Sequence, residues 1–223
     1  MGRLRKPGAA RQNAGVAPPA PRGRLRDAAV AAGIVGPGFF ISDWAVLGTR
    51  AAGYSPVRDA ISELARMHAT TRPAMTAGFV VLGAAVPAYG LALRDALPGP
   101  AWRFALVHGV ATLGVAAFAL GTPTSGKIHG AFAGVAYATL AAVPIAASVS
   151  LRRRGGRGLA RASMVTGIVC AAALVASVAG PTSVHGLLQR IGLTIGDAWL
   201  MTSAVALLTQ PAAQPATQPD RAG

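Results

Sequence analysis

The stretch GYSPVRDAISELARMH, residues 53–68, organises the chain, because it separates the first long apolar run from those that follow. It is the only long segment between the first and last apolar runs that mixes charges of both signs with apolar side chains. Ser55 followed by Pro56 is typical of a helix start, since a serine oxygen caps amide groups and proline suits the first helical position. Apolar residues then recur at helical spacing, which predicts a short amphipathic helix over residues 56–68.

The composition around this stretch is that of a membrane protein. Charged residues make up 13% of the 223 residues and hydrophobic residues 52%, whereas soluble domains carry about 25% charged residues. Six apolar segments approach the ~20 residues that a bilayer span requires. They cover residues 28–47, 74–93, 102–120, 128–149, 163–180 and 186–208. We therefore predict an all-α fold, a six-helix transmembrane bundle with a short amphipathic outer helix after the first span.

The segments outside this bundle are polar. Residues 1–26 hold seven Lys or Arg and almost no large apolar side chains, so they cannot bury enough surface to order themselves. We predict a disordered basic cytoplasmic arm over residues 1–26, a six-span membrane domain over 27–209 and a disordered cytoplasmic tail over 210–223. With the N-terminus inside, 15 of the 21 basic residues lie on the cytoplasmic side. This bias predicts a multi-pass plasma-membrane protein with both termini in the cytoplasm.

The net charge of +14 indicates which partners to expect, because a basic protein binds anionic groups. Basic residues beside apolar spans bind anionic lipid headgroups, which we expect at the cytoplasmic side. No recognition module for nucleic acid accompanies the charge, so we expect no nucleic-acid partner. The sequence implies no cofactor, and it leaves open whether copies of the chain form an oligomer.

Polar residues in or near the spans are candidates for a ligand site, because polar groups are costly in a bilayer. Asp197 falls near the middle of the sixth span and shares a helical stripe with Arg190. A structural role is the alternative, a buried hydrogen bond for Asp197 and an interfacial position for Asp43. The ligand-binding candidates are Asp43, Tyr54, Arg58, Asp59, Ser62, Glu63, Arg190 and Asp197.

Two histidines at the predicted outer face are candidates for metal ligands. His129 opens the fourth span and His185 precedes the sixth, and imidazole is a common zinc ligand. No HExxH or other close ligand spacing accompanies them, and a histidine at a helix end often serves only as a hydrogen-bonded cap.

Two small-xxx-small patterns predict close helix packing. Gly130 and Gly134 form one on the fourth span, and Gly192 and Gly196 form the other on the sixth. Such spacing lets two helix backbones approach each other in a membrane.

Several short segments together resemble a known family. They are Tyr54-Ser-Pro, Asp59-Ala-Ile-Ser-Glu-Leu64, Gly78-Phe79 with Gly83, His129-Gly130, and Gly186-Leu-Leu-Gln-Arg-Ile191 with Trp199. Over about residues 28–209 the chain resembles the bacterial domain-of-unknown-function family 998, six-span integral membrane proteins. Ala65 stands where members more usually have glycine. The resemblance implies the topology and no activity.

Three functions follow as hypotheses. The first is a membrane protein that binds a lipid, another apolar ligand or a partner protein at its outer face. The second is a small transporter that uses Asp197 as a proton or cation site. The third is an intramembrane metal-dependent lipid hydrolase that uses His129 and His185. The chain contains no catalytic motif of the kinds that define hydrolases or nucleotide-binding enzymes, which favours a protein that is not an enzyme.

Overall fold

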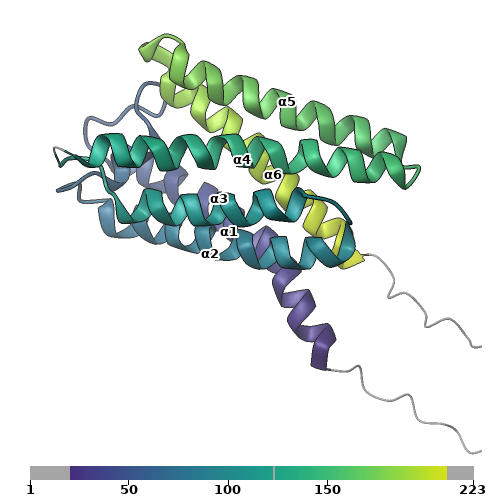
Figure 1. Cartoon of the computed structure of the whole chain (residues 1–223). Helices are drawn as coiled ribbons and strands as arrows, with labels where there is room; N and C mark the ends of the chain where they lie inside the picture. The colour runs from purple at the N-terminus through teal and green to yellow at the C-terminus, as the bar shows by residue number, and fades with distance from the viewer. Residues whose placement is uncertain (1–20, 123, 210–223) are drawn as a thin grey trace, which may run out of the picture.

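The computed structural model describes residues 21–122 and 124–209 of the chain (Figure 1). Every regular element in these residues is a helix, which confirms the predicted all-α bundle. The α-helices are α1 (Pro21–Arg50), α2 (Arg72–Ala96), α3 (Ala101–Ala117), α4 (Ser125–Arg153), α5 (Arg157–Ala179) and α6 (His185–Thr209). Two short 3-10 helices, η1 (Ile61–Ala65) and η2 (Thr182–Val184), lie in the connections.

The helices have the length and composition of membrane spans. In the described part of the chain, α1, α2, α4, α5 and α6 are long and apolar enough to cross a membrane. The remaining apolar helix, α3, is shorter. It has 17 residues, which corresponds to a length of about 26 Å at 1.5 Å per residue. It ends three residues before the predicted limit: the backbone leaves helical geometry at Phe118, and the carbonyl of Leu120 accepts the amide of Met67 at 2.8 Å.

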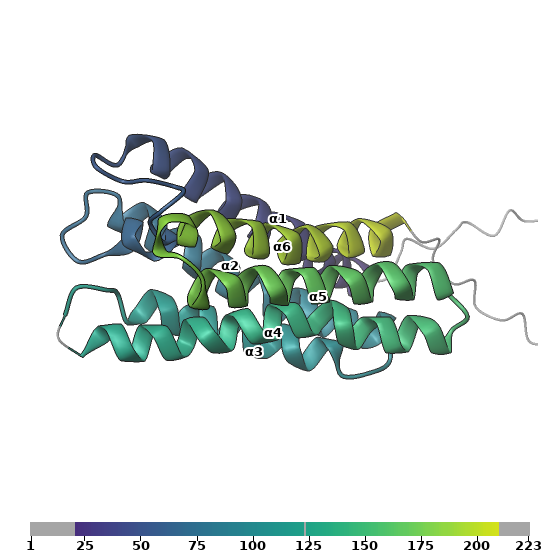
Figure 2. The ribbon, with the colours of Figure 1, turned by 90° about the horizontal axis from the view of Figure 1, so that it is seen from above.

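Successive helices run in opposite directions and close into a ring. Each helix packs against the next along the chain, and α6 returns to pack against α1. Figure 2 shows that α1 begins and α6 ends at the same end of the bundle. We call this the terminus end; it also carries the α2–α3 and α4–α5 connections. The opposite end carries the α1–α2, α3–α4 and α5–α6 connections. We call it the strap end, because the α1–α2 connection, residues 51–71, lies across it.

The two glycine patterns differ in their packing. A Cβ added at Gly192 would lie 2.6 Å from Leu174, and one added at Gly196 would lie 2.5 Å from Leu140. These glycines let α6 approach α5 and α4, as predicted. The prediction for Gly130 and Gly134 is wrong within the described chain, because both are exposed and an added Cβ would meet nothing within 4 Å. They face outward from α4 and pack against no other helix of the bundle.

The α1–α2 connection, residues 51–71, forms a strap across the end of the bundle. The predicted continuous helix over residues 56–68 is wrong: a single turn at residues 55–59 is followed by extended backbone at Ala60 and then by η1. The reason lies in α6. The amide of Gly186 donates to the carbonyl of Arg58 (3.3 Å), and the amide of Leu187 donates to that of Val57 (2.9 Å). Carbonyls that a continuous α-helix would use internally therefore serve the first turn of α6 instead.

The predicted domain limits fall close to the ends of the described residues. α1 begins at Pro21, so residues 21–26, which we assigned to the basic arm, belong to the first helix. The rest of the predicted arm, residues 1–20, and the predicted tail, 210–223, lie outside the described residues.

Candidate functional site: a clamped strap, a buried cavity and a lateral groove

Arg190, in the second turn of α6, clamps the strap to the bundle. Its side chain is buried, with 7% of the residue exposed. The guanidinium donates to the carbonyls of Pro56 (2.7 Å) and Asp59 (3.0 Å) in the strap and to that of Gly186 (2.9 Å) in α6. It also donates to the phenol oxygen of Tyr54. Arg190 forms no ion pair with the described residues, so its hydrogen bonds all go to neutral oxygens.

Two aromatic rings complete the surroundings of the guanidinium. The Arg190 Cζ atom lies 5.2 Å from the centre of the Trp44 ring and 5.5 Å from that of Tyr54, a cation–π arrangement. The Tyr54 hydroxyl donates to the carbonyl of Ala60 at 3.1 Å. Burial raises the pKa of Tyr54, and the nearby guanidinium partly opposes this shift. The phenol therefore stays neutral at physiological pH and serves as a structural hydrogen-bonding group.

Gln189, the neighbour of Arg190, links the strap to α4. Its Oε1 atom accepts the amide hydrogen of Ile61 at 2.8 Å. A backbone amide can only donate, so this bond fixes the orientation of the side-chain amide. The Nε2 group then donates to the hydroxyl oxygen of Tyr137. One side chain thus joins η1, α6 and α4 in a buried polar contact.

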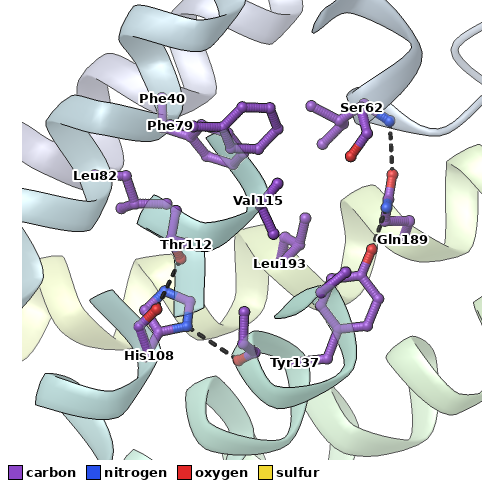
Figure 3. Close-up of a pocket in the computed structure, with 13 residues that line it drawn as sticks. Phe40, Ser62, Phe79, Leu82, His108, Thr112, Val115, Tyr137, Gln189 and Leu193 are labelled. Carbon is purple, nitrogen blue, oxygen red and sulfur yellow. Dashed lines mark hydrogen bonds between the residues drawn. The ribbon is translucent and has the colours of Figure 1, made fainter. Parts of the chain in front are cut away.

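A cavity of about 30 Å³ lies beneath the strap. Figure 3 shows Ser62, Tyr137 and Gln189 on one side of it and His108 with Thr112 on the other, with apolar side chains between them. Its remaining walls come from α1, α2, α3, α4, α6 and η1: Phe40, Ile61, Phe79, Leu82, Val115, Ala133, Ala136 and Leu193. The cavity is therefore mostly apolar, with a few polar groups at fixed positions.

His108 is the most deeply buried polar residue of this cavity, with 1% of the residue exposed. Its Nδ1 atom lies 3.0 Å from the carbonyl oxygen of Ala136. A carbonyl can only accept, so Nδ1 carries the hydrogen and Nε2 presents a lone pair in the neutral ring. This Nε2 atom has no hydrogen-bond partner among the described residues. The Thr112 hydroxyl does not donate to this Nε2 atom, because it donates to the His108 backbone carbonyl at 2.8 Å.

The predicted ligand candidates do not gather at one point. Tyr54, Asp59 and Arg190 meet in the clamp, where the guanidinium is occupied by protein oxygens. The exposed Arg58 side chain lies 3.7 Å from the Asp59 carboxylate, whose other oxygen accepts the amide of Ser55 at 2.7 Å.

The other candidates lie in separate places. Ser62 lines the cavity, and Glu63 forms an ion pair with Arg66, with a 2.8 Å bond from Nη2 to Oε1. Asp43 lies between α1 and α2, where its Oδ2 atom would be 2.4 Å from a Cβ added at Gly78. Glycine at position 78 is therefore needed for the carboxylate to fit.

Asp197 lies deep in α6, away from the clamp and the cavity. The residue is 1% exposed, and neither carboxylate oxygen has a hydrogen-bond partner among the described residues. It does not line the cavity beneath the strap. A buried carboxyl group without partners is costly in a membrane and marks a candidate functional residue.

His129 and His185 each bond to a backbone carbonyl near a helix end. The Nδ1 atom of His129 lies 2.9 Å from the carbonyl of Phe118, and the Nδ1 atom of His185 lies 2.5 Å from that of Ser177. Across residues 21–122 and 124–209, no group of three or more His, Cys, Asp or Glu side chains could hold a metal ion. The metal-ligand role of this pair stays a prediction that the geometry does not strengthen.

A groove of about 490 Å³ runs between α4 and α5 on the outside of the bundle. Its lining is almost entirely apolar: Gly134, Tyr137, Ala138, Ala141, Ala142, Ile145, Ala171, Leu174, Val175, Val178 and Ala179. Small residues of α4 form one wall and branched residues of α5 much of the other. Tyr137 lines both this groove and the cavity, so the two lie next to each other.

Sequence reasoning missed Gln189, Tyr137 and His108 as members of the site. A signal for Gln189 was present, because Gln189 and Arg190 are adjacent polar residues near the start of an otherwise apolar span. Tyr137 had no such signal, since a tyrosine within an apolar helix is consistent with ordinary packing.

The apolar helices and their ring define a multi-pass helical membrane protein. The chain matches the model of the family described as "Protein of unknown function (DUF998)" over residues 34–206. It belongs to this family, and the resemblance inferred from the sequence is confirmed. No curated protein and no solved structure matches the chain.

Proposed function

We propose that this membrane protein binds the acyl chain of a membrane lipid in the groove between α4 and α5. The observation that carries the proposal is the groove itself, an apolar depression of about 490 Å³ between two helices that are long and apolar enough to cross a membrane. Ligand sites commonly measure about 300 to 1,000 Å³ and occur between the helices of bundles. The clamp supports this choice indirectly, because the two terminal nitrogens of the Arg190 guanidinium, Nη1 and Nη2, already donate to strap oxygens.

Packing, not transfer out of water, would drive this binding. Lipid tails are as apolar as the groove, so no hydrophobic gain accompanies the exchange of one for the other. Selectivity then depends on how closely a chain fits the small residues of α4. Gly134 is suited to this role because nothing within 4 Å would contact a Cβ there, which leaves its backbone open to a chain.

The test compares two glycines on the same helix. Gly134→Leu places a large side chain in the groove, whereas Gly130→Leu places it one turn away, outside the groove lining. Neither glycine contacts another helix, and replacing glycine in a helix favours the helix by up to about 1 kcal/mol, so neither variant should unfold.

Native mass spectrometry in mild detergent measures the retained lipid. The proposal predicts that Gly134→Leu loses a lipid that the wild type and Gly130→Leu both retain. Equal retention by all three proteins would refute it.

The finer localisation is also a proposal: a plasma-membrane protein whose terminus end lies in the cytoplasm, against anionic headgroups. Basic residues in the helix ends that flank the α2–α3 and α4–α5 connections, and one within the second connection, support it: Arg94, Arg103, Arg152, Arg153, Arg154, Arg157 and Arg161. Each contributes about 1 kcal/mol of attraction when near an anionic surface. Replacing Arg152, Arg153 and Arg154 by Gln should lower the retention of phosphatidylglycerol; unchanged retention would contradict the headgroup contact.

Asp197 supports a second candidate function, a transporter with a proton or cation site. The specific observation is a carboxyl group at 1% exposure with both oxygens unpartnered. Uptake assays in proteoliposomes should then show loss of transport in Asp197→Asn. Transport that persists in this variant would remove the role.

A further inference from the structure

The cavity beneath the strap contains polar groups whose hydrogen-bonding capacity the protein does not use. His108 presents a lone pair at Nε2, because its Nδ1 hydrogen is directed to the Ala136 carbonyl at 3.0 Å. An acceptor at 1% exposure that has no partner destabilises the fold, because burial has removed its hydrogen bonds to bulk water. His108 lines the cavity (Figure 3), so this unpartnered acceptor belongs to a residue of the cavity wall.

Tyr137 supplies the complementary donor. The Gln189 amide donates to the Tyr137 oxygen, in an orientation fixed by the Ile61 amide. The phenol hydrogen is therefore not used in that contact and is available to an acceptor in the cavity. The hydroxyl of Ser62, on the same side of the cavity as Tyr137, can either donate or accept (Figure 3).

The size of the cavity selects the ligand. A cavity needs a volume of about 10 to 15 Å³ to hold one water, and the volume of this cavity is about 30 Å³. This admits about two waters and excludes a lipid chain, which separates the cavity from the function proposed for the groove. A water molecule both donates and accepts, so it matches a lone pair on His108 and a hydroxyl hydrogen on Tyr137.

We propose that this cavity is an internal hydration site, in which about two ordered waters bridge His108 to Tyr137 and Ser62 within the membrane-embedded bundle. The waters satisfy buried polar groups of α3, α4 and the strap together. The site differs from the proposed lipid site, because a cavity of about 30 Å³ is too small for an acyl chain, whereas the groove measures about 490 Å³.

The test uses the full chain in lipid nanodiscs with isotope-labelled histidine. Magnetisation transfer from water to the His108 ring should give a cross-peak in the wild type. Tyr137→Phe removes the phenol hydrogen and should abolish or strongly weaken this cross-peak. Tyr89→Phe is the matched control, since the Tyr89 hydroxyl is buried elsewhere and pairs with Ser203 at 2.7 Å; it should leave the cross-peak unchanged.

A second variant guards against misfolding of the first. Ala133→Leu fills the cavity from its wall and keeps a good helix former in α4, so it should also remove the cross-peak. A wild-type spectrum without transfer from water would overturn the proposal, and so would a full-intensity cross-peak in both variants. A cross-peak from lipid protons in place of water would assign the site to a lipid hydroxyl and overturn the water assignment.

Discussion

The replacement of Arg190 by methionine tests how the strap is held. Methionine keeps an unbranched chain of similar length but removes every donor of the guanidinium. The strap then loses the bonds to the carbonyls of Pro56 and Asp59, at 2.7 and 3.0 Å, and the bond to the Tyr54 hydroxyl. We expect the strap to open locally while the six-helix ring stays folded, because each helix of the ring also packs against its neighbours.

The free energy that Arg190→Met removes from the closed strap can be estimated from the two hydrogen bonds to carbonyls. Hydrogen bonds to charged groups contribute about 1.5 to 3 kcal/mol each, which gives about 3 to 6 kcal/mol for the pair. Part of this is offset, because Arg190 is buried without an ion-pair partner among the described residues and its removal ends that desolvation cost. A net loss of about 3 kcal/mol corresponds to about a 100-fold increase in strap opening.

Hydrogen exchange measured by mass spectrometry in nanodiscs reads this opening directly. Peptides covering residues 51–71 should exchange about 100-fold faster in Arg190→Met than in the wild type. The matched control is Arg58→Met, since the Arg58 side chain is exposed and lies 3.7 Å from one carboxylate; exposed pairs contribute at most about 1 kcal/mol. Exchange in Arg190→Met that equals that of Arg58→Met would refute the clamp.

Three further predictions concern the interior. Gly196→Leu should lower thermal stability, or prevent folding, because even a Cβ at this position would lie 2.5 Å from Leu140; thermal unfolding monitored in detergent measures this. Gln189→Leu should destabilise by about 1 to 3 kcal/mol, because it leaves the buried Ile61 amide without its 2.8 Å partner, and strap exchange should rise while exchange in α5 does not. Asp197→Asn should change the free energy of unfolding by less than about 1 kcal/mol, because the carboxylate has no hydrogen bond to lose in the described chain; a larger loss in chemical denaturation would reveal a structural partner.

The helices of the bundle could be predicted from sequence because each depends on a local property, an apolar run long enough to span a bilayer. Their limits differ from the predictions where local chemistry of another kind acts. α3 ends early, at Ala117, where Phe118 leaves helical geometry, and α1 extends back to Pro21, within the segment assigned to the arm.

The form of the strap could not be predicted in this way. Its sequence has the periodicity and the start of a helix, but residues more than 120 positions away decide its backbone. Gly186, Leu187 and Arg190 of α6 take its carbonyls, and Gln189 takes the Ile61 amide. The apolar spacing of residues 56–68 does not reveal that hydrogen bonds from α6 will compete with those of a local helix.

The glycine pairs illustrate the same limit. Gly130 and Gly134 have the same spacing as Gly192 and Gly196, yet only the second pair packs against neighbouring helices. Which face of a helix meets another helix depends on the closure of the ring, and spacing alone does not contain that information. The open pair instead leaves Gly134 at the edge of the groove.

Photo-crosslinking from the bilayer tests the central proposal, the lipid groove, most directly. A phospholipid with a photoreactive group in its acyl chain, incorporated into nanodiscs with the full chain, labels the residues that its chain contacts. The account predicts labelling concentrated on α4 residues 134–145 and α5 residues 171–179, reduced in Gly134→Leu and unchanged in Gly130→Leu. Labelling spread evenly over the outward faces of the helices, and insensitive to Gly134→Leu, would contradict it.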